Sequence, residues 1–315
     1  MPEQKKIIAV FGATGAQGGG LARAILADQA GPFAVRAITR NPDSDKARAL
    51  AGLGAQVVAG DADAPETLES ALAGAYGVFC VTNFWEHMSP PRELAQATAM
   101  AGAAERAGGQ HVVWSTLEDT RKNVPLADGR LPTLHGQYKV PHFDAKGEAD
   151  AAFAGLPTSF LLAAFYWENF IYFGMQPQPN AAGVLQLSLP LGGQKLPGIS
   201  AGDIGKCAYG IFKRGPAAIG MRFGIAGDVL SGAEMAAAFT RALGREVLFQ
   251  DVPFDVYRGL GFPGADDLGN MFQYHQLMGA DFLKARDPKL SRELNPELLD
   301  FDAWLAANAS RIPLG

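Results

Sequence analysis

The chain has 315 residues, of which 48% are hydrophobic and 19% are charged, and this composition is typical of a globular protein long enough for two lobes. Its 27 basic and 32 acidic residues give a net charge of −5, and no dense run of Lys and Arg occurs, which disfavours direct nucleic-acid binding. The longest apolar stretch, 160–167, is far shorter than the roughly 20 residues of a membrane span. The first predicted strand also follows Met1 closely, so we expect a cytoplasmic protein with no membrane partner.

Short apolar runs alternate with helical patterns through the first half of the chain. Runs such as IIAVF, GVFCV and HVVWS are apolar without alternation, which is typical of strands buried on both faces by crossover helices. The pattern therefore predicts an α/β fold with a doubly wound parallel sheet of the Rossmann type. The predicted strands cover 6–11, 34–39, 56–59, 78–81, 111–115 and 158–163.

The pattern changes after Phe165 to an aromatic-rich stretch, followed by Pro- and Gly-rich pieces. We therefore predict an NAD(P)-binding Rossmann domain over residues 1–164 and a smaller C-terminal α/β lobe over residues 165–315. Within this lobe we expect strands near Met221 and Val247, and a helix over 200–213 that can pack back against the first domain. Neither cysteine has the spacing of a disulfide framework or a metal site, so both are expected to be core thiols.

A glycine-rich turn separates the first predicted strand from the first predicted helix. In this turn Gly12 permits the tight bend, Gly15 lets the backbone approach a pyrophosphate, and Gly18 lets the helix pack against the strand. The free N–H groups at the start of the helix then face the phosphates. The turn predicts a dinucleotide-binding site.

The residues that follow the other strands indicate which dinucleotide binds. An NAD-binding domain places a carboxylate at the end of its second strand, but here Arg40 stands there and can pair with a 2′-phosphate. NADP(H) is therefore the expected cofactor, with NAD(H) the less favoured one. Asp61 follows the third strand near the expected adenine, and Thr82 and Asn83 follow the fourth strand beside the expected ribose and nicotinamide.

The segments FGATGAQGG, TRNP, VTNFWE, HFDAKGE and GFPGADDLGNMF together resemble the NmrA-like family of atypical short-chain dehydrogenase relatives, and in particular its NADPH-sensing branch. The resemblance extends over essentially the whole chain. It implies an NADP(H)-binding protein that senses the redox state of the cofactor and acts through a protein partner or as a homodimer. It assigns cofactor contacts to Gly12, Thr14, Gly15, Gln17, Gly18, Arg40, Thr82, Asn83, Lys146, Tyr166, Trp167, Glu168 and Asn169.

The catalytic residues of an ordinary short-chain dehydrogenase are only partly present. Such enzymes use a Tyr, a Lys four residues later on the same helix face, and a Ser at a strand end; here His142 replaces the Tyr, while Lys146 and Ser115 remain. His142 is either a structural replacement that only makes hydrogen bonds or a general acid. Ser115 can hold a substrate carbonyl or cap the next element, and Tyr138 or Tyr166 could replace the missing acid.

Two functions follow from these observations. The first is a redox sensor that acts through partners, based on the resemblance and the missing Tyr; the second is an NADPH-dependent reductase of quinone-like or other electrophilic small molecules, based on Lys146 and Ser115. Aromatic residues at Trp85 and in 165–173 either form an apolar substrate pocket or join the two lobes. Without the Tyr we expect little activity on simple secondary alcohols and ketones.

Overall fold

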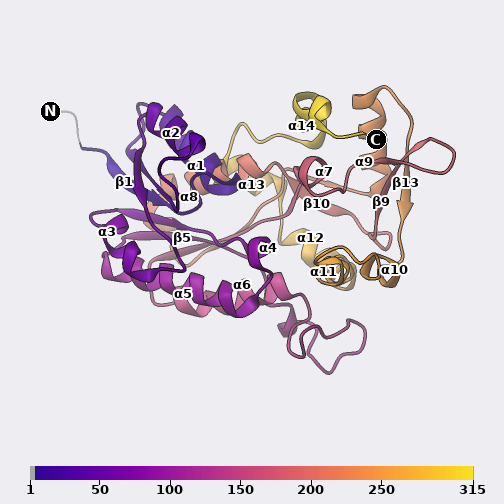
Figure 1. Cartoon of the computed structure of the whole chain (residues 1–315), viewed down its shortest axis with the longest axis horizontal. Helices are drawn as coiled ribbons and strands as arrows, with labels where there is room; N and C mark the ends of the chain where they lie inside the picture. Colours follow the sequence, from indigo (N-terminus) through magenta and orange to yellow (C-terminus); the bar gives the residue numbers. More distant parts are fainter. Residues whose placement is uncertain (1–3, 315) are drawn as a thin grey trace.

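A seven-stranded sheet dominates the N-terminal part of the computed structural model, which describes residues 4–314 (Figure 1). All neighbouring strands pair in parallel, in the order β11-β6-β5-β4-β1-β2-β3. The order reverses between β1 and β4, and ligands of such sheets bind at the carboxyl ends of the strands beside that reversal. The doubly wound α/β fold predicted from the sequence is confirmed. The strands are β1 (Lys6–Val10), β2 (Phe33–Thr39), β3 (Gln56–Ala59), β4 (Gly77–Cys80), β5 (His111–Thr116), β6 (Thr158–Leu162) and β11 (Arg222–Gly224).

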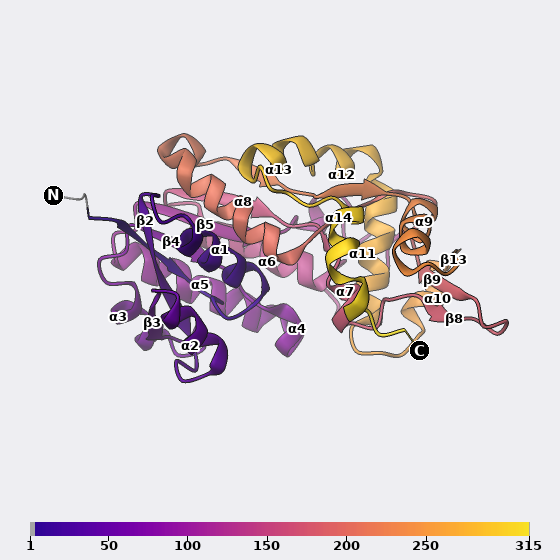
Figure 2. The ribbon, with the colours of Figure 1, turned by 90° about the horizontal axis from the view of Figure 1, so that it is seen from above.

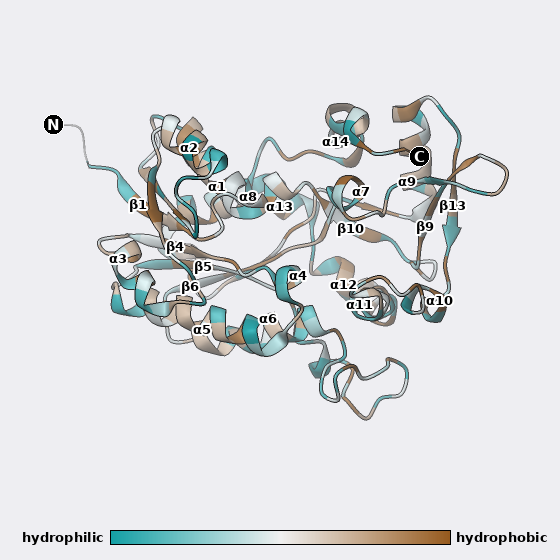
Figure 3. Cartoon of the chain, viewed as in Figure 1, coloured by the Kyte–Doolittle hydropathy of each residue, from teal (hydrophilic) through white to brown (hydrophobic). Residues whose placement is uncertain are grey.

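Helices cover both faces of this sheet, which is why its strands are apolar without alternation (Figure 3). One face packs against α1 (Ala16–Ala27), α2 (Asp45–Gly52), α8 (Ala201–Arg214) and α13 (Pro288–Leu294). The other face packs against α3 (Leu68–Leu72), α5 (Pro90–Arg106) and α6 (Pro141–Phe153). Cys80 and Cys207 are free and buried in these two cores, as expected. No helix in the described part of the chain is long and apolar enough to cross a membrane.

Helices α1 and α8 touch through their backbones although they are far apart in the sequence (Figure 2). A Cβ added to Gly20 would lie 2.3 Å from the carbonyl oxygen of Gly202, and one added to Gly205 would lie 2.1 Å from the backbone nitrogen of Leu21. Only glycine permits this approach. Helices α8 and α13 and strand β11 lie beyond residue 164, so residues 201–224 and 288–294 complete the layers around the N-terminal sheet.

The C-terminal lobe contains two small sheets and a group of helices (Figure 1). Its first sheet contains β12 (Asp228–Leu230), β10 (Leu196–Ile199) and β7 (Phe165–Tyr166), and its second contains β13 (Val247–Asp251), β9 (Leu185–Leu189) and β8 (Gln178–Pro179). Its helices are α7 (Asn169–Tyr172), α9 (Gly232–Leu243), α10 (Phe254–Arg258), α11 (Ala265–Met278), α12 (Ala280–Lys284) and α14 (Phe301–Asn308). Short 3-10 turns cover Pro65–Thr67, Thr120–Lys122, Gly215–Ala218 and Ala309–Arg311. The short helix α4 (Phe84–His87) follows β4 and lies between the sheet and this lobe.

Candidate active site

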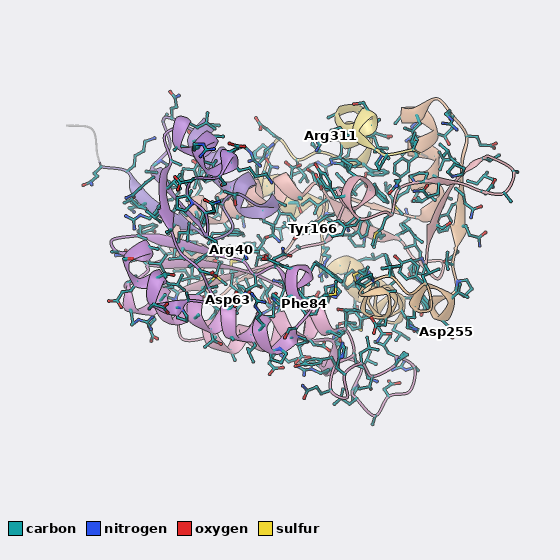
Figure 4. The ribbon with its side chains drawn as sticks, in the orientation of Figure 1. Arg40, Asp63, Phe84, Tyr166, Asp255 and Arg311 are labelled. Carbon is teal, nitrogen blue, oxygen red and sulfur yellow. The ribbon has the colours of Figure 1, made fainter. Side chains whose placement is uncertain are left out.

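A cavity of about 520 Å³ lies at the carboxyl ends of the central strands, where the sheet meets the C-terminal lobe. Figure 4 shows Tyr166 and Phe84, two residues of its lining, near the centre of the molecule. The cavity brings together most of the residues that the sequence assigns to the site. These are Gly12, Gly15, Gln17, Gly18, Thr82, Asn83, Ser115, His142, Lys146, Tyr166, Glu168 and Asn169.

The glycine turn forms the polar floor of the cavity. Gly12 has a positive φ of 61°, and a Cβ on Gly18 would lie 2.5 Å from the carbonyl oxygens of Phe11 and Gly12. Gly15 caps α1 without a side-chain hydrogen bond, and the first turn of α1 carries no acidic residue. The first N–H groups of α1 are therefore free of side-chain partners, as a bound phosphate requires.

Three side chains form a hydrogen-bonded chain along the cavity wall. Ser115 Oγ donates to Gln17 Oε1 over 2.7 Å, and Gln17 Nε2 donates to the hydroxyl of Tyr166. Burial of the hydroxyl raises the pKa of Tyr166 to about 12, so the phenol is neutral at pH 7. The chain links the start of α1 to the end of β5 and to the first strand of the C-terminal lobe.

Lys146 points from α6 to the end of β4, as expected from its position four residues after His142. Its Nζ lies 2.6 Å from Thr82 Oγ1 and 2.9 Å from Oε1 of Glu93 on α5. Glu93 is fully buried, and His87 Nε2 lies 3.3 Å from its other oxygen. The lysine is therefore held at the cavity by a buried carboxylate that the sequence analysis did not identify.

Arg40 is not among the lining residues and lies on the surface directly after β2. Its guanidinium forms an ion pair with both carboxylate oxygens of Glu86 on α4, with Nη2 3.1 Å from Oε2. The two side chains are 58% and 42% exposed. A 2′-phosphate bound by Arg40 would have to compete with Glu86 for the same donors.

We predict that Glu86→Gln strengthens NADPH binding by up to about fivefold and leaves NADH binding unchanged. An exposed ion pair contributes about 0.2–1 kcal/mol, and its removal frees Arg40 for the 2′-phosphate. Calorimetric dissociation constants for both cofactors provide the measurement. Glu246→Gln, an exposed glutamate in the C-terminal lobe, is the matched control. An equal change for NADH and NADPH would show that Glu86 does not act through the 2′-phosphate.

His142 is held by an aspartate from the C-terminal lobe. Its Nδ1 lies 2.7 Å from Oδ1 of Asp267 on α11, and its backbone N–H donates to Oδ2 over 3.1 Å. The imidazole packs against the rings of Trp85 and Phe143, with centroid distances of 4.8 and 4.9 Å. Asp267 therefore orients a histidine whose ring borders the cavity.

Three other predicted site residues, Thr14, Asp61 and Trp167, are not among the lining residues. Trp167 differs most from expectation, because it is buried in an aromatic cluster with Phe301 and Trp304 of α14. Thr14 is half-buried in the glycine turn, and Asp61 accepts a turn hydrogen bond from the backbone of residue 63. The two residues after Trp167 do line the cavity. The carboxylate of Glu168 accepts a hydrogen bond from the backbone N–H of Ala201 over 2.8 Å and so caps α8, and Asn169 is the first residue of α7.

The far part of the cavity is apolar and belongs mainly to the C-terminal lobe. Phe143, Leu268, Met271 and Phe282 contribute to its lining, together with His275. Both ring nitrogens of His275 are buried without hydrogen-bond partners among residues 4–314. Burial holds its pKa well below the usual range, so this imidazole is neutral. The cavity thus joins a polar half at the strand ends to an apolar half under α11 and α12.

Comparison with known proteins decides the family of the chain. The model of the NmrA-like family matches residues 4–305. The chain belongs to the NmrA-like family. The NmrA-like family domain-containing oxidoreductase hkm9 of Aspergillus hancockii is 30% identical to it over 295 residues, which cover 89% of this chain and 85% of that protein.

Solved structures place the NmrA-like chain among atypical short-chain dehydrogenase folds. The negative transcriptional regulator NmrA gives a TM-score of 0.78 at 25% identity, covering 96% of this chain and 95% of that one. That regulator has been solved with NAD and with NADP. The triphenylmethane reductase of Citrobacter sp., solved with NADP(H), gives a TM-score of 0.73 at 18% identity, covering 96% and 99% of the two chains, and this likeness shows the fold alone.

The acidic residues that pair with the basic residues of this NmrA-like site differ in whether the sequence pattern pointed to them. Asp267 lies within the segment GFPGADDLGNMF, which carried part of the family resemblance, so the sequence itself drew attention to this residue. Glu86 ends the segment VTNFWE, which also carried part of the resemblance, whereas Glu93 had no signal, because a glutamate in an amphipathic helix is usually exposed. Their partners Arg40 and Lys146 are more than 45 residues distant in the chain.

Proposed function

We propose that this protein is an NAD(P)H-dependent reductase of an apolar aromatic compound. The observation that carries the proposal is the continuous cavity, which joins the polar strand ends to an apolar chamber of the C-terminal lobe. Its volume of about 520 Å³ lies in the range of small-molecule sites. The oxidoreductase names of relatives such as hkm9 support the same function.

The residues at the strand ends fit a dinucleotide. The close approach at Gly18 and the uncapped start of α1 suit the pyrophosphate, and Lys146 lies where it can donate to the ribose hydroxyls. Arg40 supports a preference for NADP(H), while its ion pair with Glu86 keeps that preference modest. When bound in reduced form, the dinucleotide would supply a hydride; the chain binds it, orients it and excludes water.

Cofactor oxidation provides the test. The purified protein is mixed with NADPH or NADH and a panel of quinones, aromatic aldehydes and triphenylmethane dyes, and the absorbance of the reduced cofactor is followed. We expect turnover of at least about one per second for an aromatic acceptor. Oxidation no faster than the protein-free blank across the panel, with the cofactor bound, would contradict the reductase function.

A matched pair of variants tests the role of the apolar chamber. Leu268→Trp should fill the chamber and abolish turnover while leaving cofactor binding within about twofold, because Leu268 lines the apolar half. Val256→Trp on the exposed side of α10 is the control and should retain activity. Equal loss of activity in both variants would show that the chamber has no specific role.

The second candidate function is a cofactor sensor, and the Arg40–Glu86 ion pair supports it. This pair ties α4 to the end of β2, and Trp85 of α4 packs on His142, so a 2′-phosphate that captures Arg40 would release α4. Tyr172 and Phe173 are exposed at the cavity and offer an apolar surface for a protein partner or a second copy. Hydrogen exchange in 84–88 should then increase with NADPH and not with NADH.

A further inference from the structure

The pair formed by His142 and Asp267 has the geometry of an oriented proton carrier. Both side chains are buried, at 7% and 6% exposure. Because a carboxylate only accepts hydrogen bonds, the 2.7 Å contact places a hydrogen on Nδ1 of His142. The same carboxylate accepts the backbone N–H of His142, so the ring and its helix are held together.

The other ring nitrogen, Nε2, has no hydrogen-bond partner within residues 4–314, and the ring borders the cavity. Lys146 lies one turn further along α6 and contacts the end of β4. Trp85 of α4 and Phe143 of α6 pack on the ring, and its contact with Asp267 fixes Nδ1 on the side away from Nε2. Nε2 is therefore the atom that a cavity ligand would meet.

We propose that His142, oriented by Asp267, donates the proton that completes reduction of an aromatic carbonyl compound in this cavity. The proposal rests on the reductase function above. The carbonyl carbon receives the hydride of the reduced dinucleotide, and the electron pair of the C=O double bond moves onto oxygen. That oxygen takes the Nε2 proton of the doubly protonated ring, so the products are an alcohol, the oxidised dinucleotide and a neutral imidazole that keeps its Nδ1 hydrogen; a proton from the solvent then restores the imidazolium.

The charges around His142 favour this role. A carboxylate on Nδ1 stabilises the imidazolium needed to donate a proton, as in other histidine-carboxylate pairs. His275, the other titratable group that α11 places in this wall, is neutral because burial lowers its pKa. The charge of Lys146 is balanced by Glu93 from α5. Asp267 is thus the charged group that contacts the ring.

The substrate class follows from the two halves of the cavity. Phe143, Leu268, Met271 and Phe282 can bury an aromatic ring system, whereas a small aliphatic ketone would leave this chamber unfilled. The carbonyl group would lie at the polar boundary, within reach of Nε2 and beside Ser115. An aromatic aldehyde or ketone satisfies both halves.

The test compares an acceptor that needs a proton with one that does not. Reduction of 2-naphthaldehyde requires a hydride and a proton, whereas the cation of a triphenylmethane dye such as crystal violet requires a hydride alone. His142→Phe keeps an aromatic ring packed against Trp85 and Phe143. We expect it to lower kcat for the aldehyde by about 100-fold or more and to change dye reduction less than about threefold.

Asp267→Asn tests the positioning residue. It should lower kcat for the aldehyde by about tenfold with little change in KM or in dye reduction, because the amide cannot balance the imidazolium charge. A measurement without turnover uses 2-naphthamide, whose carbonyl accepts a hydrogen bond but is not reduced. Calorimetry should show that 2-naphthamide binds the native protein about fivefold more tightly than it binds the His142→Phe variant. The affinity for NADPH should be equal in the native protein and the variant.

The outcomes separate this inference from the reductase function. Equal loss of aldehyde and dye reduction in His142→Phe, or no loss of either, would show that His142 is only structural. Reduction of the dye but not of the aldehyde by the native protein would overturn the proton-donor role and leave the reductase intact. Reduction of neither acceptor, with NADPH bound, would overturn the reductase function and this inference with it.

Discussion

Arg286→Met is expected to destabilise the protein by about 3–5 kcal/mol, because it leaves a mostly buried carboxylate without its partner. Arg286 is fully buried, and its guanidinium binds both oxygens of Glu118 at 2.6 and 2.8 Å. Its Nε also donates to the carbonyl of Ala163, and its charge lies 4.0 Å from the ring centre of Phe282. Urea unfolding followed by circular dichroism provides the measurement.

Two further variants make this prediction specific. Arg214→Met removes an exposed ion pair with Glu293 and should cost at most about 1 kcal/mol. The double variant Arg286→Met with Glu118→Gln should recover part of the loss, since no charge is then left buried. A cost for Arg286→Met no larger than that for Arg214→Met would contradict the argument.

The Arg286–Glu118 ion pair makes the free energy of unfolding depend on pH. Burial alone would raise the pKa of Glu118, but the charge and hydrogen bonds of Arg286 outweigh burial and hold it below its ordinary value. A lowered pKa in the folded state contributes stability that is complete above the pKa of the unfolded chain and is lost as pH falls through the folded value. Stability should therefore decrease below about pH 4 in the native protein.

Lys146→Met is the second variant with a large expected effect, and it acts on stability and on cofactor binding. Removal of the ammonium leaves the fully buried Glu93 with only His87 near its other oxygen, so we expect a loss of about 3 kcal/mol in urea unfolding. The lost donor should also weaken dinucleotide binding at least tenfold, because a charged hydrogen bond contributes about 1.5–3 kcal/mol.

A double variant separates the two effects. Lys146→Met with Glu93→Gln should regain much of the stability, since a neutral amide replaces the buried charge, but it should not regain cofactor affinity. Lys122→Met, an exposed lysine on the turn after β5, is the control and should change neither property. Cofactor affinity that recovers fully in the double variant would show that Lys146 only neutralises Glu93.

The sheet could be predicted from the sequence because its strands are short apolar runs. The glycine turn that joins the first strand to the first helix also marks the first parallel connection. Each of the predicted strands from 6–11 to 158–163 overlaps an observed strand. The strand expected near Met221 exists as β11, but its place beside β6 could not be predicted. Only residues Arg222–Gly224 pair there, and so short a run has no periodicity to assign it to a sheet.

The sequence predicted those residues of the candidate site whose positions depend on the geometry of one turn or one helix. The glycine turn and the four-residue spacing of His142 and Lys146 follow from strand and helix geometry alone. The partners of these residues follow from tertiary packing, which brings Asp267 to His142 across 125 residues. The side chain of Trp167 packs into the core of the neighbouring lobe, because an aromatic residue beside a predicted site fits a core equally well, and the sequence pattern does not distinguish the two positions.

The glycine contact between α1 and α8 can form only late in synthesis, because α8 lies far beyond α1 in the chain. Until residues 201–224 leave the ribosome, α1 lacks the helix that covers it, and β6 pairs only with β5 and remains an edge strand. The glycine turn is synthesised first, whereas this layer of helices is completed only by α13, which follows the chamber residues Leu268, Met271 and Phe282 in the chain. We expect the nascent chain to gain dinucleotide affinity late, and chaperones to recognise the exposed apolar face of α1 until then.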